Sequence, residues 1–268
     1  MTCTLTACAA LVMCGCSGDA TSAGGSGSAV ASGTSAVAPA SGAPSIASVT
    51  SAAAAGTAAP TTPPAPEGMV YVGPATFDAV VGGGSVVRSE VRGFFIDKEK
   101  VTNGAFKKCY EDRACVVASA SSLDFLKPNL VGGPVTNIAQ GEARAFCKSV
   151  GKRLPSAAEW QLAARGPEGR TFPWGNEEPA ACSPPDCKPV RVKTPEGLIG
   201  MAGMLWEMSD GDVCFVKAAK PELCTQKAAV IHGGAWNTSA TSFKVLEVHD
   251  ASSVPASTVS FRCVKDAG

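Results

Sequence analysis

The clearest pattern of hydrophobic and polar positions lies between residues 156 and 165 and predicts an α-helix. Ser156 and Glu159 form the Ser-x-x-Glu sequence of a capping box, whose two side chains satisfy free N–H groups at a helix start. The helix is therefore expected to begin at Ala157. Trp160 and residues 162–164 give it an apolar face with an aromatic anchor and small side chains, which is typical of a buried helix.

Two more helices are predicted upstream. Thr102 is the expected N-cap of the first, and Thr136 or Asn137 is the expected N-cap of the second. Gly151 is expected to end the second helix, because glycine readily adopts the left-handed conformation that follows a helix. Their apolar positions recur at helical spacing and are Phe106, Cys109 and Tyr110 in the first, and Ala143, Phe146, Cys147 and Val150 in the second.

Short strands are predicted around these helices. The first is expected at Met69–Val72 and the second at 86–96, after a turn at Gly82–Gly84. The remaining predictions are a brief strand at 190–192, late strands at 229–231 and 259–263 with Phe261 packed inward, and irregular segments at 116–133 and 172–176. The pattern therefore predicts a mixed α+β fold with few helices, short strands and much irregular loop.

The N-terminal quarter of the chain has a different composition from the rest. Residues 1–16 are predicted to be a lipoprotein-type signal peptide, because the apolar run 5–13 is too short to span a bilayer and ends near Gly15 and Cys16, the expected lipidation site. Because no Lys or Arg precedes the run, a simple secretion signal or a misplaced start codon stays open. Residues 17–66 are almost entirely Ala, Ser, Gly, Thr, Val and Pro, which predicts a disordered tether. The folded domain is expected at 67–268.

Charge and cysteine content limit the classes of function. The chain has 23 basic and 23 acidic residues and no basic block, so nucleic acid is not an expected partner. Membrane contact is expected only through the lipid anchor, with the protein on the periplasmic side or the outer surface of the cell envelope, or secreted as the second choice. No metal-type Cys-x-x-Cys pairs occur, which disfavours a zinc site.

The predicted domain contains an even number of cysteines, which indicates disulfide bonds formed in an oxidising compartment. Their short spacings suggest three small loops, and two cysteines then remain. The suggested pairs are Cys109 with Cys115, Cys182 with Cys187 and Cys214 with Cys224, and the remaining residues are Cys147 and Cys263. Connectivity cannot be deduced from sequence alone.

Six short motifs in order across residues 69–265 resemble the formylglycine-generating enzyme family, also called the sulfatase-modifying factor domain. The motifs are FIDKEKVTN at 95–103, GKRLPSAAEW at 151–160, FPWGN at 172–176, GMAGMLWE at 200–207, HGGAW at 232–236 and SFRC at 260–263. The resemblance implies a C-type-lectin-like architecture. It also implies a bond between Cys147 and Cys263, since the family pairs cysteines at these positions; closing so long a loop contributes up to roughly 4 to 5 kcal/mol in the chain-entropy model.

The catalytic residues that the resemblance would imply are absent. Family oxidases hold copper with two cysteines that follow a Gly-Gly-Ser-aromatic motif, because Cu(I) prefers thiolate ligands. The corresponding motif here is HGGAW, and the matching positions are Thr238 and Phe243. Neither a hydroxyl nor a phenyl ring replaces a thiolate toward copper, so no catalytic residue is predicted.

The family also holds calcium near the segment that matches 200–207. Glu207 matches the carboxylate position, but Gly200 and Met204 stand where oxygen-bearing side chains are expected. Glu207 is therefore a weakened calcium candidate, and no other cofactor is expected. Asp210 and Asp212 could join Glu207 in a different site, although a solvated acidic turn is the preferred interpretation.

These features predict a non-catalytic sulfatase-modifying-factor-like domain of a cell-envelope lipoprotein. It would bind an envelope protein, peptide or glycan, or serve a structural role. His232, Trp206 and Trp236 are predicted to line a pocket. A structural role is the preferred interpretation of His232 and His249. Two alternatives stay open: a formylglycine-generating oxidase that borrows Cys214 and Cys224, and an enzyme of changed chemistry that uses Glu207, Asp210, His232 or His249 with a bound ion.

Overall fold

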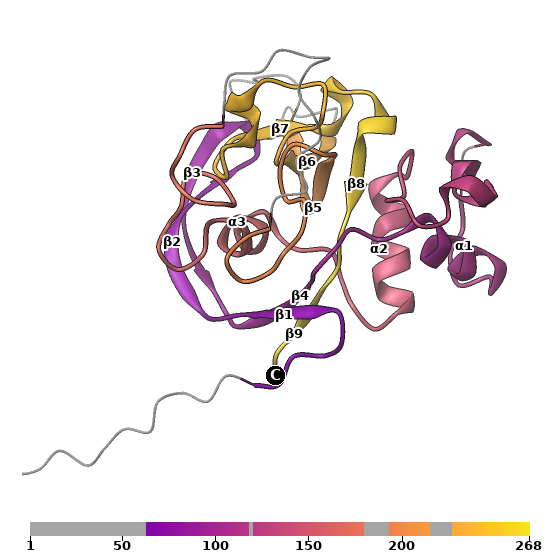
Figure 1. Ribbon diagram of the computed structural model, residues 1–268, viewed down its shortest axis with the longest axis horizontal. Helices are drawn as coiled ribbons and strands as arrows, with labels where there is room; N and C mark the ends of the chain where they lie inside the picture. The colour runs from indigo at the N-terminus through magenta and orange to yellow at the C-terminus, as the bar shows by residue number, and fades with distance from the viewer. Residues whose placement is uncertain (1–62, 118–119, 180–192, 215–226) are drawn as a thin grey trace, which may run out of the picture. The chain divides into compact units, whose positions relative to one another are not determined.

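The computed structural model describes residues 63–117, 120–179, 193–214 and 227–268. This part of the chain forms a mixed α+β fold with helices α1 (Asn103–Glu111), α2 (Gln140–Ser149) and α3 (Ala157–Arg165) (Figure 1). The predicted signal peptide with Cys16 and residues 17–62 of the predicted tether lie outside the described residues. Among the described residues, none of the helices has the length and apolarity needed to cross a membrane.

Helix α3 forms as the capping box predicts. The Ser156 hydroxyl accepts a hydrogen bond from the Glu159 amide at 3.2 Å, and the Glu159 carboxylate accepts one from the Ser156 amide at 2.8 Å. The helix begins at Ala157 and is followed by Gly166 with a φ of 64°. Trp160 is fully buried on the apolar face, so both the start and the inward face of the helix are confirmed.

The other two helices confirm one cap and correct the other. Thr102 caps α1 by accepting a hydrogen bond from the Ala105 amide at 3.2 Å. Helix α2 is not capped by Thr136 or Asn137, because it begins later, with Ala139 at the N-cap position. Alanine has no oxygen to offer the helix start, and the Glu142 carboxylate instead accepts from the Ala139 amide at 2.8 Å. Gly151 follows the helix with a φ of 69°.

The described strands form three sheets whose order is not the chain order. A three-stranded sheet has the order β1-β4-β9, β2 and β3 form a hairpin, and the four-stranded sheet has the order β7-β6-β5-β8. The only parallel pair among these strands joins β5 and β8. The bounds are β1 Met69–Val72, β2 Ala75–Val81, β3 Ser85–Val91, β4 Phe94–Asp97, β5 Trp206–Cys214, β6 Lys227–His232, β7 Val248–Asp250, β8 Val259–Phe261 and β9 Val264–Asp266.

The predicted strand at 86–96 is in fact two strands. The turn at Gly82–Gly84 returns the chain so that β3 pairs with β2, whereas β4 pairs with β1 and β9 in another sheet. The break falls at Gly93, where a side chain would collide with the Tyr71 hydroxyl. Apolar residues occur on both sides of this break, at Val91 and again at 94–96, so one strand was predicted where there are two.

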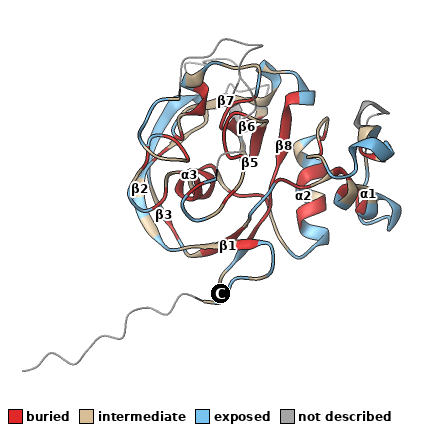
Figure 2. Cartoon of the chain, in the orientation of Figure 1, coloured by how far each residue is buried: buried red, intermediate tan, exposed pale blue. Residues whose placement is uncertain are grey.

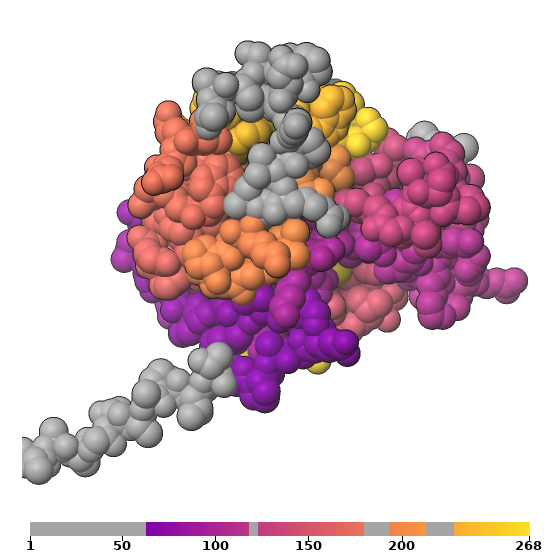
Figure 3. Space-filling view, in the orientation of Figure 1, coloured from indigo at the N-terminus to yellow at the C-terminus, as the bar shows by residue number. Residues whose placement is uncertain are grey.

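Two apolar clusters form the core of the domain. One contains the ring of Phe106, which stacks on Phe146 at 5.5 Å between centroids and lies edge-on to Phe261 at 6.4 Å. The other packs Trp160 and Leu162 of α3 with the buried residues of β4. Figure 2 shows that burial is densest in α3 and in β5, β6 and β8, while Figure 3 shows α1 and its following segment gathered on one side of the domain.

Two disulfide bonds link described residues. Cys109 bonds to Cys115 within a six-residue separation, and Cys147 of α2 bonds to Cys263, which lies between β8 and β9. The second bond ties α2 to the short segment that links the four-stranded sheet to the three-stranded sheet. Cys182, Cys187 and Cys224 lie outside the described residues, and Cys214 is described only as the last residue of β5.

Candidate functional site

The segment that matches the family's copper site is a tight loop after β6. Its backbone lies against the loop before β5, because the Gly203 amide donates to the Gly233 carbonyl at 2.9 Å and the Trp236 amide donates to the Met204 carbonyl at 3.2 Å. Gly233 has a φ of 84°, and a side chain there would collide with the Met201 carbonyl oxygen. The loop therefore requires glycine at this position for two separate reasons, conformation and space.

Thr238, which is predicted to match the first of the two thiol positions, closes this loop. Its hydroxyl accepts a hydrogen bond from the Ala235 amide at 3.0 Å and donates one to the Ala235 carbonyl at 2.8 Å. Its own amide also donates to the Ala235 carbonyl at 3.0 Å. The side chain is thus committed to local backbone groups.

Phe243, which is predicted to match the second thiol position, fills the space beside the loop. It ends the 3₁₀ helix η5 (Ala240–Phe243) and is 4% exposed. It belongs to a small apolar cluster with Phe172 and Ala202, against which Trp174 is packed. These residues present a hydroxyl and a phenyl ring where Cu(I) would need thiolates, so they do not fit a copper ion.

The predicted pocket of His232, Trp206 and Trp236 is not formed. His232 and Trp206 are 0% and 2% exposed, whereas Trp236 is 46% exposed. The His232 ring stacks on Trp160 with 4.7 Å between ring centroids. The ring centroids of Trp206 and His249 are 4.8 Å apart. The prediction was wrong because the three residues come from two motifs of the resemblance, and the pairing of β5 with β6 buries Trp206 and His232.

Burial also sets the protonation state of His232. Loss of hydration lowers the pKa of His232 to about 3, although the negative charge of Glu207 acts in the opposite direction. The neutral ring lies with its Nε2 atom 3.0 Å from the Ser209 hydroxyl. A ring so deeply buried and held neutral is suited to a packing role.

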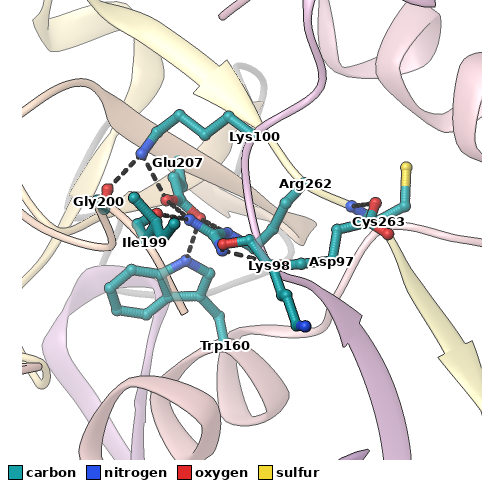
Figure 4. A network of polar contacts seen from close by, with 9 residues as sticks. All are labelled: Asp97, Lys98, Lys100, Trp160, Ile199, Gly200, Glu207, Arg262 and Cys263. Carbon is teal, nitrogen blue, oxygen red and sulfur yellow. Dashed lines mark hydrogen bonds and ion pairs between the residues drawn. The ribbon is translucent and has the colours of Figure 1, made fainter. Parts of the chain in front are cut away.

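Glu207 lies at the centre of a buried polar network (Figure 4). Arg262 reaches both carboxylate oxygens, with Nε at 2.6 Å from Oε2 and Nη2 at 2.7 Å from Oε1. Lys100 places Nζ at 2.7 Å from Oε1, and the Trp160 indole donates to Oε2 at 2.8 Å. Burial alone would raise the pKa of Glu207, but the charges of Arg262 and Lys100 outweigh it and hold the pKa at about 2.

This arrangement does not fit a calcium ion on Glu207. Calcium takes six to eight oxygen ligands, but both oxygens of this carboxylate already contact cationic or N–H groups. Gly200 and Met204 add no side-chain oxygen, and a side chain at position 200 would come within 2.7 Å of the Met204 sulfur. The described residues contain no group of three or more His, Cys, Asp or Glu side chains placed to hold a metal ion.

The acidic turn does not join Glu207. Asp210 and Asp212 are exposed and turn toward Arg144, which lies 2.7 Å from Asp210 and 4.0 Å from Asp212. His249 is partly exposed and has its Nε2 atom 3.5 Å from a Glu247 carboxylate oxygen. The residues considered for changed chemistry are therefore scattered over separate environments.

Sequence reasoning missed the two cations that surround Glu207. Lys100 lies in the motif FIDKEKVTN and Arg262 in the motif SFRC, so both residues stood in segments on which the family resemblance rests. Neither motif indicates that the two meet on one carboxylate, because they are separated by more than 160 residues.

The chain matches the family model described as "Sulfatase-modifying factor enzyme 1-like domain" over residues 51–267. It therefore belongs to this family. Curated relatives include an inactive C-alpha-formylglycine-generating enzyme 2 from Bos taurus, 29% identical over 123 residues and covering 38% of each chain. A formylglycine-generating enzyme from Mycobacterium tuberculosis is 45% identical over 47 residues, or 18% of this chain and 16% of the relative. The match thus spans well under half the length of each.

Solved structures support the fold. The crystal structure of CarF matches with a TM-score of 0.54 and 18% identity, covering 75% of this chain and 98% of its own. PvdO from Pseudomonas aeruginosa matches with a TM-score of 0.55 and 16% identity, covering 74% and 94%. These likenesses confirm the predicted family fold, and at such identities they carry no statement about activity.

Proposed function

We propose that this chain is a non-catalytic sulfatase-modifying-factor-like domain of a cell-envelope lipoprotein, which serves as a binding or structural module. One observation carries the proposal. The two positions that hold copper in family oxidases are Thr238, whose hydroxyl closes a backbone turn, and Phe243, whose ring is buried. Without thiolates at these positions, the domain lacks ligands for the metal that the oxidation requires.

A relative named as inactive supports the same interpretation. The bovine protein called inactive C-alpha-formylglycine-generating enzyme 2 shows that a domain of this family can be retained without the oxidase activity. The match covers only part of that protein, so its other properties are not transferred.

Trp236 is the side chain we propose for contact with the partner. It is 46% exposed and lies in the loop after β6, where its own amide donates to the Met204 carbonyl. Tryptophan supplies a large contact area with few rotatable bonds and is enriched where proteins bind one another. The proposed partner is an envelope protein, a peptide or a glycan.

Copper binding and product formation test the loss of activity. The full-length purified protein would be titrated with Cu(I) and incubated with a cysteine-containing sulfatase peptide, with a catalytic formylglycine-generating enzyme as the positive control. We expect no stoichiometric copper site and no aldehyde in the peptide by mass spectrometry. Formylglycine product would overturn the proposal, and a Cys214→Ser, Cys224→Ser variant would then show whether these two cysteines supply the thiols.

The proposed lipid anchor is tested independently. Cys16→Ala should abolish metabolic labelling with a radioactive fatty acid and move the protein from the membrane fraction to the soluble fraction. Cys14→Ala is the matched control, because it removes a neighbouring thiol and leaves the expected lipidation site in place. Unchanged labelling of Cys16→Ala would contradict the anchor.

A further inference from the structure

The ammonium group of Lys100 lies where two oxygens of the buried network converge. Its Nζ atom contacts Oε1 of Glu207 at 2.7 Å and also donates to the Gly200 carbonyl oxygen. The lysine side chain is only 3% exposed. A buried ammonium is costly unless it is paired and hydrogen-bonded, so this position is built around a cation.

We infer that Lys100 is a tethered cation that takes the role a bound divalent ion would have at this segment. The carboxylate and a backbone carbonyl are the kinds of oxygen that calcium uses, and here the lysine contacts one of each. An ion bound from solution would have to displace the ammonium, whose charge repels it. Because the cation is part of the chain, the folded core does not depend on the free concentration of any metal.

The residues next to Lys100 also favour a lysine ammonium over a bound metal ion. Gly200 has a φ of 66°, and the Met204 sulfur fills the space that a side chain at position 200 would need. An oxygen-bearing side chain is therefore missing at both positions, and a soft thioether is a poor ligand for a hard cation. Lys100 therefore supplies a positive charge beside Glu207 where the side-chain oxygens that would hold a metal ion are missing.

The inference predicts how the wild-type protein responds to metal. Its melting temperature should be the same in a calcium chelator and in millimolar calcium, because only a ligand that binds the folded state shifts unfolding. A fall in melting temperature on chelation, or a rise with calcium, would overturn the inference. This measurement does not depend on any variant folding.

Truncation of Lys100 tests the cation directly. Lys100→Met should lower the melting temperature by at least about 5 °C relative to Lys98→Met, since it leaves a buried carboxylate short of one partner. Lys98 is the matched control, because it carries the same charge on the same segment but is exposed. Equal melting temperatures for the two variants would contradict the inference.

Chemical rescue separates a missing charge from missing packing. Lys100 borders a small hollow of about 20 Å³ that also touches Glu99 and Thr102, and Lys100→Ala would enlarge it. Ethylammonium should raise the melting temperature of Lys100→Ala more than sodium does at equal ionic strength, and should leave Lys100→Met unchanged because the methionine fills the space. An Ala variant that responds equally to both salts would show that the position does not require a cation. The test is independent of the proposed function, which concerns Thr238 and Phe243.

Discussion

Arg262 and Glu207 form a two-point ion pair in which neither side chain has any exposed surface. The five N–H groups of the guanidinium all find acceptors. Besides the two Glu207 oxygens, Arg262 donates to the carbonyls of Asp97, Lys98 and Ile199 at 2.9, 3.0 and 2.9 Å. The pair therefore joins β5, the end of β4 with the residue that follows it, and the loop at Ile199 through a single planar group.

Arg262→Lys should destabilise the fold strongly. A lysine keeps the charge but cannot reproduce the planar fork, so the backbone carbonyls that Arg262 contacts would lose donors, while Lys100 and Trp160 still contact Glu207. Because each buried polar group left without its hydrogen-bond partner costs about 1–3 kcal/mol, the free energy of unfolding measured with guanidinium chloride should fall by at least that amount. Arg88→Lys is the matched control, since its pair with Asp78 is exposed and such pairs contribute roughly 0–1 kcal/mol. Similar losses for both variants would be inconsistent with the network.

The two described disulfides should differ in their contribution to stability. Cys147 and Cys263 are separated by 116 residues, and Cys109 and Cys115 by 6. In the chain-entropy model, the loss of the long loop costs about 5 kcal/mol and the loss of the short loop about 2 kcal/mol. Denaturation of Cys147→Ala, Cys263→Ala and of Cys109→Ala, Cys115→Ala would measure both. A larger loss for the short loop would mean that strain or local packing dominates over chain entropy.

Acid should destabilise the domain in part through His232. Its pKa is lowered from 6.5 to about 3, so between these values the unfolded chain binds a proton that the folded chain excludes. Stability therefore falls as the pH drops from about 6.5 towards 3, by up to about 1.4 kcal/mol per pH unit.

A variant isolates the contribution of this histidine. His232→Gln removes the titrating ring and should flatten the fall in unfolding free energy between pH 6.5 and 4.5, above the range in which Glu207 contributes. Glu207 also makes the folded protein less stable in acid. Its pKa is lowered from 4.5 to about 2, so its contribution to stability is lost as the pH falls through that interval. His249→Gln should keep the slope, because it leaves His232 in place. A slope unchanged by His232→Gln would show that the ring is protonated in the folded protein.

Gly233→Ala should be among the more damaging single-methyl additions in the domain. Its φ of 84° disfavours an L-residue, and the added carbon would collide with the Met201 carbonyl oxygen, which is part of the backbone and cannot rotate away. We expect a loss of more than about 2 kcal/mol in unfolding free energy. Gly132→Ala is the control, because a side chain at Gly132 meets nothing within 4 Å. A tolerated Gly233→Ala would mean that the loop can shift away from Met201.

Local chemistry was sufficient to predict several elements. Ser156 and Glu159 specify the start of α3 through contacts only three residues apart, and Thr102 does the same for α1. Such contacts join residues that are neighbours in the sequence, so the sequence pattern is enough to predict them. The cap of α2 was missed because Ala139 has no side-chain oxygen that would mark a helix start. The carboxylate that accepts from its amide belongs to Glu142, inside the helix.

The amino-acid sequence by itself determined the family, the starts of α1 and α3 and the absence of thiols at Thr238 and Phe243, because each depends on which residues occur within a short segment. Only the tertiary structure decided that Trp206 and His232 are buried and that Lys100, Arg262 and Trp160 converge on Glu207. These contacts join residues that are far apart along the chain. Hydrophobic burial and strand pairing bring them together, and a carboxylate removed from water must then find its partners in whichever segments the fold places beside it.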